Sequence, residues 1–310
     1  MGETYLVRAK LEFSWEFEEE ESQQSIKVPK QLPVNFGPFY LDRSPNDKFY
    51  LMNLGLIDEV LTEGLNPDWD YPISLLYVEL KIQTEGDQQP EYEADDILEQ
   101  LEAMLRLFQE GDVALRRHYY HTWRIEEGNP KPVIFLSSRP PKPEPATLYP
   151  RKPYKLEDEA LHGFIEFFNS YWDIINQKHQ PIYNALYRFN SSYERRTLSD
   201  RLIELMIGME ALFGDKEYQR YKIPLRCACM LYPPGKVRKQ AFTTIKKFYD
   251  ERSAIIHGSK LELDPNSKGE VDQFEEYTRR SILKFLEVHK DGCPITSGAQ
   301  LDDLLFFDGE

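Results

Sequence analysis

Apolar residues recur every three or four positions through the second half of the chain, a spacing typical of amphipathic helices. The clearest run covers residues 236–258, KVRKQAFTTIKKFYDERSAIIHG. Its apolar stripe passes through Val237, Ala241, Ile245, Phe248 or Tyr249, and Ile256. Glycine tolerates the left-handed conformation that ends a helix, so the run predicts a helix with His257 at its tip and Gly258 as its stop.

The same periodicity predicts further helices at residues 155–177, 180–189, 198–214, 223–231 and 269–292. In the third of these, LSDRLIELMIGMEALFG, Glu210 interrupts a strongly apolar run, and Ser199 or Asp200 is the expected N-cap. The fourth contains Arg226 between apolar neighbours. Together these segments predict an all-α helical bundle over residues 156–310.

The first half of the chain has a different pattern. Apolar and polar residues alternate in residues 5–18 and 72–83, and residues 131–138 form a short apolar run, so we expect three strands there. Between them, residues 93–111 have helical periodicity with acidic residues in the first turn. Residues 1–139 are therefore predicted to form a mixed α+β domain.

A proline-rich segment separates the two halves. Six prolines lie between Pro140 and Pro153, where they oppose helix formation and favour an extended spacer. We expect a linker at residues 140–155.

Charge is distributed unevenly along the chain. Residues 1–150 carry 28 acidic and 14 basic side chains, whereas residues 151–310 carry 25 and 24. Within the second half, residues 195–260 hold 14 basic and 7 acidic groups. This local excess predicts a basic surface, with Arg238, Lys246 and Lys247 as RNA-backbone ligands. The alternative is that these side chains form the solvated face of a helix.

The three cysteines and the lack of a secretory leader or a long apolar run predict a cytoplasmic protein without membrane contact. Cys227 and Cys229 are separated by one residue, unlike a zinc or redox pair, and we expect them to be small buried apolar groups. No metal and no cofactor is predicted.

Arg252 and His257 are the residues with the most specific chemistry. A guanidinium can neutralise a phosphate, and an imidazole can transfer a proton near neutral pH. Arg116 and His121 share the same spacing, so spacing alone does not distinguish a site. A buried arginine needs an acidic partner or an anionic ligand. Glu210 is expected either to pair with Arg252 or Arg226 inside the bundle or to lie on the solvent side of its helix.

The Arg-Ser-x-x-x-His-Gly ending of this helix, together with LSDRLIELMIGMEALFG and IPLRCACML, resembles the Apea-like branch of the HEPN superfamily over residues 156–290. The resemblance implies a helical domain that pairs two-fold and joins two Arg-x4-His motifs in one metal-independent RNA-cleaving cleft. It assigns Arg252 to the scissile phosphate and His257 to proton transfer. Ser253 stands where the family more commonly has Asn, Asp or His.

The N-terminal half carries no catalytic motif. The acidic run at residues 16–22 has the composition of a solvated loop, and RRHYYHTW at residues 116–123 offers either core aromatics or a base-stacking surface. We expect this half to act as a sensor, a partner-binding surface or a regulator. The acidic and apolar tail at residues 300–310 is expected to dock on another subunit or on the first domain.

Two functions of different classes fit the sequence. The first is a metal-independent endoribonuclease that acts as a homodimer or higher homo-oligomer in prokaryotic antiphage defence or a stress response. The alternative is a non-catalytic scaffold that binds RNA or protein, in which Arg252 and His257 hold a dimer interface. A cleft for a mononucleotide signal is a third possibility.

Overall fold

The computed structural model describes residues 3–13, 33–43, 76–84, 90–126, 129–133, 148–152, 154–295 and 297–306. Two compact units divide the chain. One takes in residues up to 143 together with 151–169, and the other takes in residues 144–150 and 170–310. Most of the predicted linker, residues 140–155, lies outside the described residues. The boundary between the two units, after residue 169, falls within helix α4 (Asp158–Asn176).

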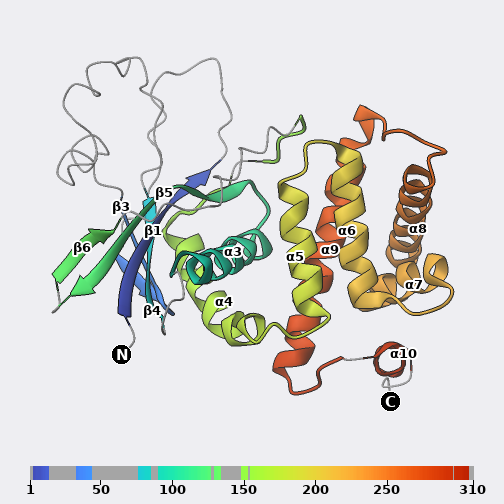
Figure 1. Cartoon of the computed structure of the whole chain (residues 1–310). Coiled ribbons are helices and arrows are strands. Elements are labelled where there is room, and N and C mark those ends of the chain that lie inside the picture. The colour runs from blue at the N-terminus through green and yellow to red at the C-terminus, as the bar shows by residue number, and fades with distance from the viewer. Residues whose placement is uncertain are drawn as a thin grey trace. The chain divides into compact units, whose positions relative to one another are not determined.

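The first unit is built on a six-stranded antiparallel sheet with the order β2-β3-β4-β1-β5-β6 (Figure 1). Its strands are β1 (Glu3–Phe13), β2 (Val34–Phe36), β3 (Phe39–Arg43), β4 (Leu76–Thr84), β5 (Val113–Glu126) and β6 (Asn129–Val133). Strands predicted at residues 5–18, 72–83 and 131–138 correspond to parts of β1, β4 and β6. The described region thus has a mixed N-terminal part, followed by a helical C-terminal part.

Register explains why β1 and β4 alternate as they do. Tyr5 is paired with Ile82 and Val7 with Leu80, and all four side chains are buried. Because successive residues of a strand point to opposite faces, one face of the sheet is apolar. Helix α3 (Pro90–Phe108) packs against this sheet.

Strand β5 and the β2–β3 hairpin were missed by the sequence pattern. The residues 116–123 that lack clear alternation lie within β5, and their side chains are outside the described set. The hairpin turns at Gly37, which has φ +51°. A Cβ there would come within 2.5 Å of the Phe168 ring, so both the conformation and the space require glycine.

A buried polar network fixes α3 to β5. Arg106 is paired with Glu102 at 2.6 Å, and both side chains are almost fully buried. The Arg106 Nε donates to the Val113 carbonyl at 3.0 Å, and Glu102 accepts from the Leu115 N–H at 2.9 Å. These bonds satisfy charges that would otherwise be costly to bury.

The second unit is helical (Figure 1). It contains the end of α4 (Asp158–Asn176) and then α5 (Ile182–Tyr193), α6 (Leu198–Phe213), α7 (Gln219–Leu231), α8 (Lys236–Ile256), the short 3-10 helix η1 (Pro265–Ser267), α9 (Lys268–Lys290) and α10 (Gly298–Phe306). Helices α5, α6 and α9 pack on one another, and α7 and α8 form a hairpin that also contacts α6. Among the described residues, no helix combines the length and apolar character needed to cross a bilayer.

The core of this unit lies around α6. Leu202, Leu205, Met206 and Met209 are fully buried. Arg201 is buried beside them, and its Nη2 contacts Asp272 and Glu275 of α9, each at 2.9 Å. An ion pair network therefore joins α6 to α9 within an apolar interior.

Two details of the helix predictions were wrong. Thr197, instead of Ser199 or Asp200, is the N-cap of α6, and its side chain accepts from the Asp200 N–H at 3.1 Å. The Ser199 hydroxyl instead accepts from the Leu263 N–H. In α8, Ala241, Ile245 and Phe248 are buried, but Val237 and Ile256 are 57% and 50% exposed, so the buried stripe is shorter than predicted.

Candidate functional site

Arg252 lies in the last two turns of α8, on the side of the helix that faces the bundle. Counting about 100° per residue, it falls between the directions of buried Ile245 and Phe248. Its side chain is 21% exposed, so the helix carries the guanidinium to the border between the interior and solvent.

Glu210 of α6 is the acidic partner of Arg252. The Arg252 Nη2 lies 3.4 Å from the Glu210 Oε2, and the Glu210 side chain is also 21% exposed. The contact is long for a charge-assisted hydrogen bond. The Arg252 Nε and the Glu210 Oε1 are both buried and have no hydrogen-bond partner in the part of the chain that the structure describes. The pair is thus only partly satisfied, because it has one long contact and leaves the buried Arg252 Nε without an acceptor.

Burial raises the pKa of Glu210 above its usual value, and the neighbouring Arg252 guanidinium offsets only part of this effect. The folded state therefore binds the Glu210 proton more tightly than the unfolded chain does. The resulting contribution to stability is complete below the unfolded pKa of about 4.3 and is lost as the pH rises through the folded pKa.

Replacing Glu210 by glutamine is therefore expected to stabilise the protein more at pH 7.5 than at pH 4.5, by removing the cost of a buried carboxylate. Thermal unfolding of both proteins at the two pH values measures this. Glu270→Gln, at a 49%-exposed carboxylate, is the control and should give no gain at pH 7.5. A Glu210→Gln protein that loses stability at pH 7.5 would show that the Arg252 attraction outweighs burial.

His257 is the C-cap of α8 and is exposed. Its backbone N–H donates to the Ser253 carbonyl at 3.0 Å. Gly258 then takes φ +74°, and the Ser259 N–H returns to the Ala254 carbonyl at 2.9 Å. These bonds end the helix with the imidazole at its tip and open to solvent.

Arg252 and His257 do not lie on one face of the helix. Five residues at about 100° each place them roughly 140° apart around the axis. Ser253 lies one turn before His257 on the same face and is half-buried. A single α8 therefore presents the imidazole and the guanidinium in different directions.

Arg226 belongs to a different part of the unit. It is 1% exposed, and its Nε and Nη2 each bind the Asp302 carboxylate of α10 at 2.7 Å. The Nη1 donates to the Phe213 carbonyl at 2.8 Å. Of the two arginines considered for Glu210, the structure selects Arg252, and Arg226 holds α10 in place instead of supporting the Arg252 site.

The three predicted RNA-backbone ligands differ in how strongly other residues of the chain already bind them. Lys247 is bound to Glu270 of α9 through both carboxylate oxygens, at 2.8 and 2.6 Å. The Arg238 Nε donates to the Tyr232 carbonyl at 2.6 Å. Lys246 has no ion pair within the described residues. The pKa of Asp250 is lowered mainly by the hydrogen bond from Arg220, and the charge of Lys246 adds a smaller effect in the same direction. The basic excess of residues 195–260 is thus partly neutralised, and Lys246 is the least engaged of the three.

The cysteines carry no catalytic arrangement. Cys227 is buried beside the Ser281 hydroxyl, and burial raises the pKa of its thiol to about 12. Cys229 is half-buried and Cys293 is exposed, so only Cys227 has the full burial predicted for the pair. Within the described ranges, no group of three or more His, Cys, Asp or Glu side chains is placed to hold a metal ion.

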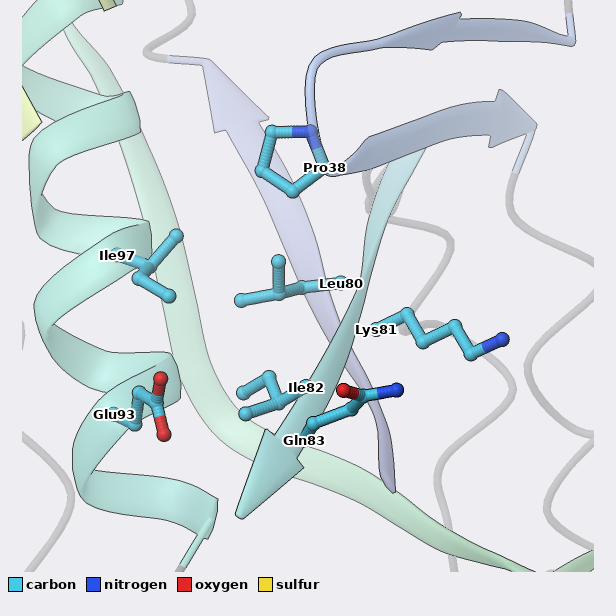
Figure 2. A pocket seen from close by; sticks show the side chains of 7 residues that line it. All are labelled: Pro38, Leu80, Lys81, Ile82, Gln83, Glu93 and Ile97. Carbon is cyan, nitrogen blue, oxygen red and sulfur yellow. The ribbon is translucent and has the colours of Figure 1, made fainter. Parts of the chain in front are cut away.

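A hollow of about 480 Å³ lies in the first unit, between β4 and α3. Figure 2 shows Leu80, Ile82 and Ile97 converging between strand and helix, with Glu93 beside them, while Lys81 and Gln83 point away from the helix. The lining includes no histidine, cysteine or hydroxyl side chain. The lining of this hollow therefore combines apolar side chains with the polar side chains of Lys81, Gln83 and Glu93.

Comparison with known proteins adds no relative. Neither a family model, nor a curated protein, nor a solved structure matches this chain.

The sequence patterns did not identify the aromatic residues near the Arg252 and His257 motif. Tyr218 and Tyr221 on α7 are 75% and 56% exposed, and the Tyr221 ring meets Phe242 of α8 at 5.5 Å between centroids. A signal was present: Phe242 and Tyr249 stand among Lys246 and Lys247 in the basic run.

Proposed function

We propose that the helical unit is a HEPN-like, metal-independent endoribonuclease that acts as a dimer through paired Arg-x4-His motifs. The observation that carries the proposal is the incomplete pairing of Arg252. This guanidinium is largely removed from solvent, yet one 3.4 Å contact to Glu210 is its only hydrogen bond within the described chain. A phosphate is the type of ligand that would complete its coordination.

In the reaction, the RNA 2′-hydroxyl oxygen attacks the adjacent phosphorus and the bond from phosphorus to the 5′-oxygen breaks. The products are a 2′,3′-cyclic phosphate and a free 5′-hydroxyl. His257 transfers a proton at the 2′-hydroxyl or at the leaving oxygen, and Arg252 stabilises the charge that develops on the phosphate.

The dimer part of the proposal rests on the end of α8. Arg252 and His257 point in different directions in one copy, so a two-fold partner is needed to bring a guanidinium and an imidazole to one phosphate. Ile256 is 50% exposed and Leu261 is 91% exposed on either side of His257. Exposed apolar side chains beside the motif favour burial against a second subunit.

Purified protein incubated with RNA in EDTA should cleave it, and Arg252→Ala and His257→Ala should each lower the rate by about 10²-fold or more. Gel analysis with detection of the cyclic phosphate end measures this. Lys284→Ala is the matched control, since its ammonium is bound to Glu287 of α9 and lies outside both the motif and the basic run of residues 195–260. Cleavage that persists in either motif variant would reject the role of that residue.

One observation favours the alternative, a non-catalytic scaffold that binds RNA or protein. Glu210 places a carboxyl group against Arg252, and when ionised it competes with a phosphate for the guanidinium. Under this alternative, wild-type protein shows no cleavage, and Arg252→Ala and His257→Ala weaken dimerisation. Analytical ultracentrifugation of the same three proteins distinguishes the two functions.

A further inference from the structure

An aromatic surface borders the motif along the α7–α8 hairpin. It consists of Tyr218, Tyr221, Phe242 and Tyr249, here called the aromatic face. Tyr218 and Tyr221 are mostly exposed, and Phe242 and Tyr249 are half-buried. The Tyr221 and Phe242 rings meet edge to face at 5.5 Å, with an interplanar angle of 71°. Exposed aromatic rings on one helix of a hairpin, one of them in contact with a ring of the other helix, indicate a binding role.

The α8 part of this face also carries cations. Arg238, Phe242, Lys246, Tyr249 and Ser253 recur at steps of four, four, three and four residues, which places them on one side of the helix. This row of residues leads to Ser253, which lies between Arg252 and the turn that presents His257. Aromatic and basic side chains therefore alternate along a path that ends at the motif.

The contacts between α7 and α8 are consistent with this arrangement. The Arg238 Nε of α8 donates to the carbonyl of Tyr232, the C-cap of α7, at 2.6 Å. Arg220 of α7 binds Asp250 of α8 through both of its carboxylate oxygens. The two helices thus run side by side over this length. The negative charge of Asp250 is also offset by Arg220, which lessens its repulsion of an anion.

Tyr218 has an additional feature. It is the N-cap of α7 and takes the left-handed conformation, with φ +61° and ψ +29°. For a bulky residue this conformation is disfavoured, and such strain recurs at binding sites. In this conformation the phenol ring of Tyr218 is 75% exposed and lies one turn before Tyr221.

We propose that the aromatic face stacks unpaired bases of an RNA strand while Arg238 and Lys246 contact its phosphates, so that the substrate is single-stranded where it approaches the motif. Aromatic rings stack on any base, and neighbouring cations follow the backbone. From Phe242 to Ser253 the helix rises about 16 Å, which matches roughly five stacked nucleotides at 3.4 Å each. A base-paired strand keeps its bases inside the duplex and cannot use these rings.

This inference rests on the proposed function, so binding is measured apart from cleavage. The probe is a fluorescein-labelled 2′-O-methyl RNA 12-mer, which lacks the attacking hydroxyl, presented alone or annealed to its complement. Wild-type protein should bind the single strand more tightly than the duplex, and Tyr221→Ala should weaken single-strand binding by roughly 5- to 100-fold. Tyr221→Phe keeps the ring and should bind like wild type.

Tyr187→Ala is the matched control, because Tyr187 is a 52%-exposed tyrosine on α5, outside the aromatic face. Thermal unfolding confirms that the variants are folded. Equal binding by wild type and Tyr221→Ala overturns the inference, and EDTA-resistant cleavage by wild type would then leave the proposed function standing. A change in dimer mass for Tyr221→Ala, with unchanged RNA affinity, also overturns it by assigning the aromatic face to a second copy of the chain.

Discussion

Replacing Arg201 by methionine is expected to lower the free energy of unfolding by about 3–5 kcal/mol, because the change removes the cation facing two acids inside the bundle. Arg201 is fully buried, and Glu275, one of its two partners, has a side chain only 8% exposed. Methionine retains much of the volume, so the loss reports the missing charge. Urea unfolding followed by helical circular dichroism measures it.

Two further variants separate charge from packing at this position. Arg201→Met combined with Glu275→Gln should recover part of the loss, since the second change removes a buried anion. Lys247→Met breaks a pair whose members are both 49% exposed and should cost less than about 1 kcal/mol. An Arg201→Met protein as stable as wild type would show that the network contributes no net stability.

The second large effect is expected at Arg226. Replacing it by leucine removes two 2.7 Å bonds to Asp302 and the bond to the Phe213 carbonyl, and should cost about 3 kcal/mol or more. The loss should be concentrated in α10, because Asp302 and the Gly298 carbonyl link that helix to Arg226. Hydrogen exchange of residues 298–306 is the measurement, with residues 236–256 as the internal reference.

The same pair defines a pH dependence. The hydrogen bond from Arg226 is the main cause of the lowered pKa of Asp302. A lowered carboxyl pKa stabilises the folded state above the unfolded value of about 3.9, and this stability is lost as the pH falls through the folded pKa. Protection of α10 should therefore persist at pH 5 in wild type. Equal protection in Arg226→Leu would contradict a holding role for this arginine.

Periodicity predicted most of the helical unit because burial there follows the helical repeat. Leu202, Leu205 and Met209 are spaced as a helix requires, and all are buried. The stripe in α8 failed at Val237 and Ile256, because an apolar residue near a helix end has few neighbours to cover it. In the sheet, β5 was missed because its central residues are polar, basic and aromatic without alternation.

The candidate site was predictable only in part. The sequence placed Arg252 in the apolar stripe of its helix, but it left open whether Glu210 pairs with Arg252, pairs with Arg226 or faces solvent. The choice depends on Asp302, which lies 76 residues from Arg226 and occupies that guanidinium. Likewise, Glu270 engages Lys247 from another helix, so a local count of charge overstated the basic surface. Long-range pairings of this kind leave no local pattern in the sequence.

The turn at Gly258 has a consequence for how this chain can vary. Its φ is +74°, and a Cβ at this position would meet no atom within 4 Å, so the turn demands a conformation but imposes no packing. It fixes the end of α8, which stops at Ile256 with His257 as its C-cap. Substitutions between Arg252 and His257 leave the position of this turn unchanged. A single inserted residue would instead turn the imidazole by about 100° relative to the guanidinium. Drift in composition is therefore compatible with the site, and drift in length is not.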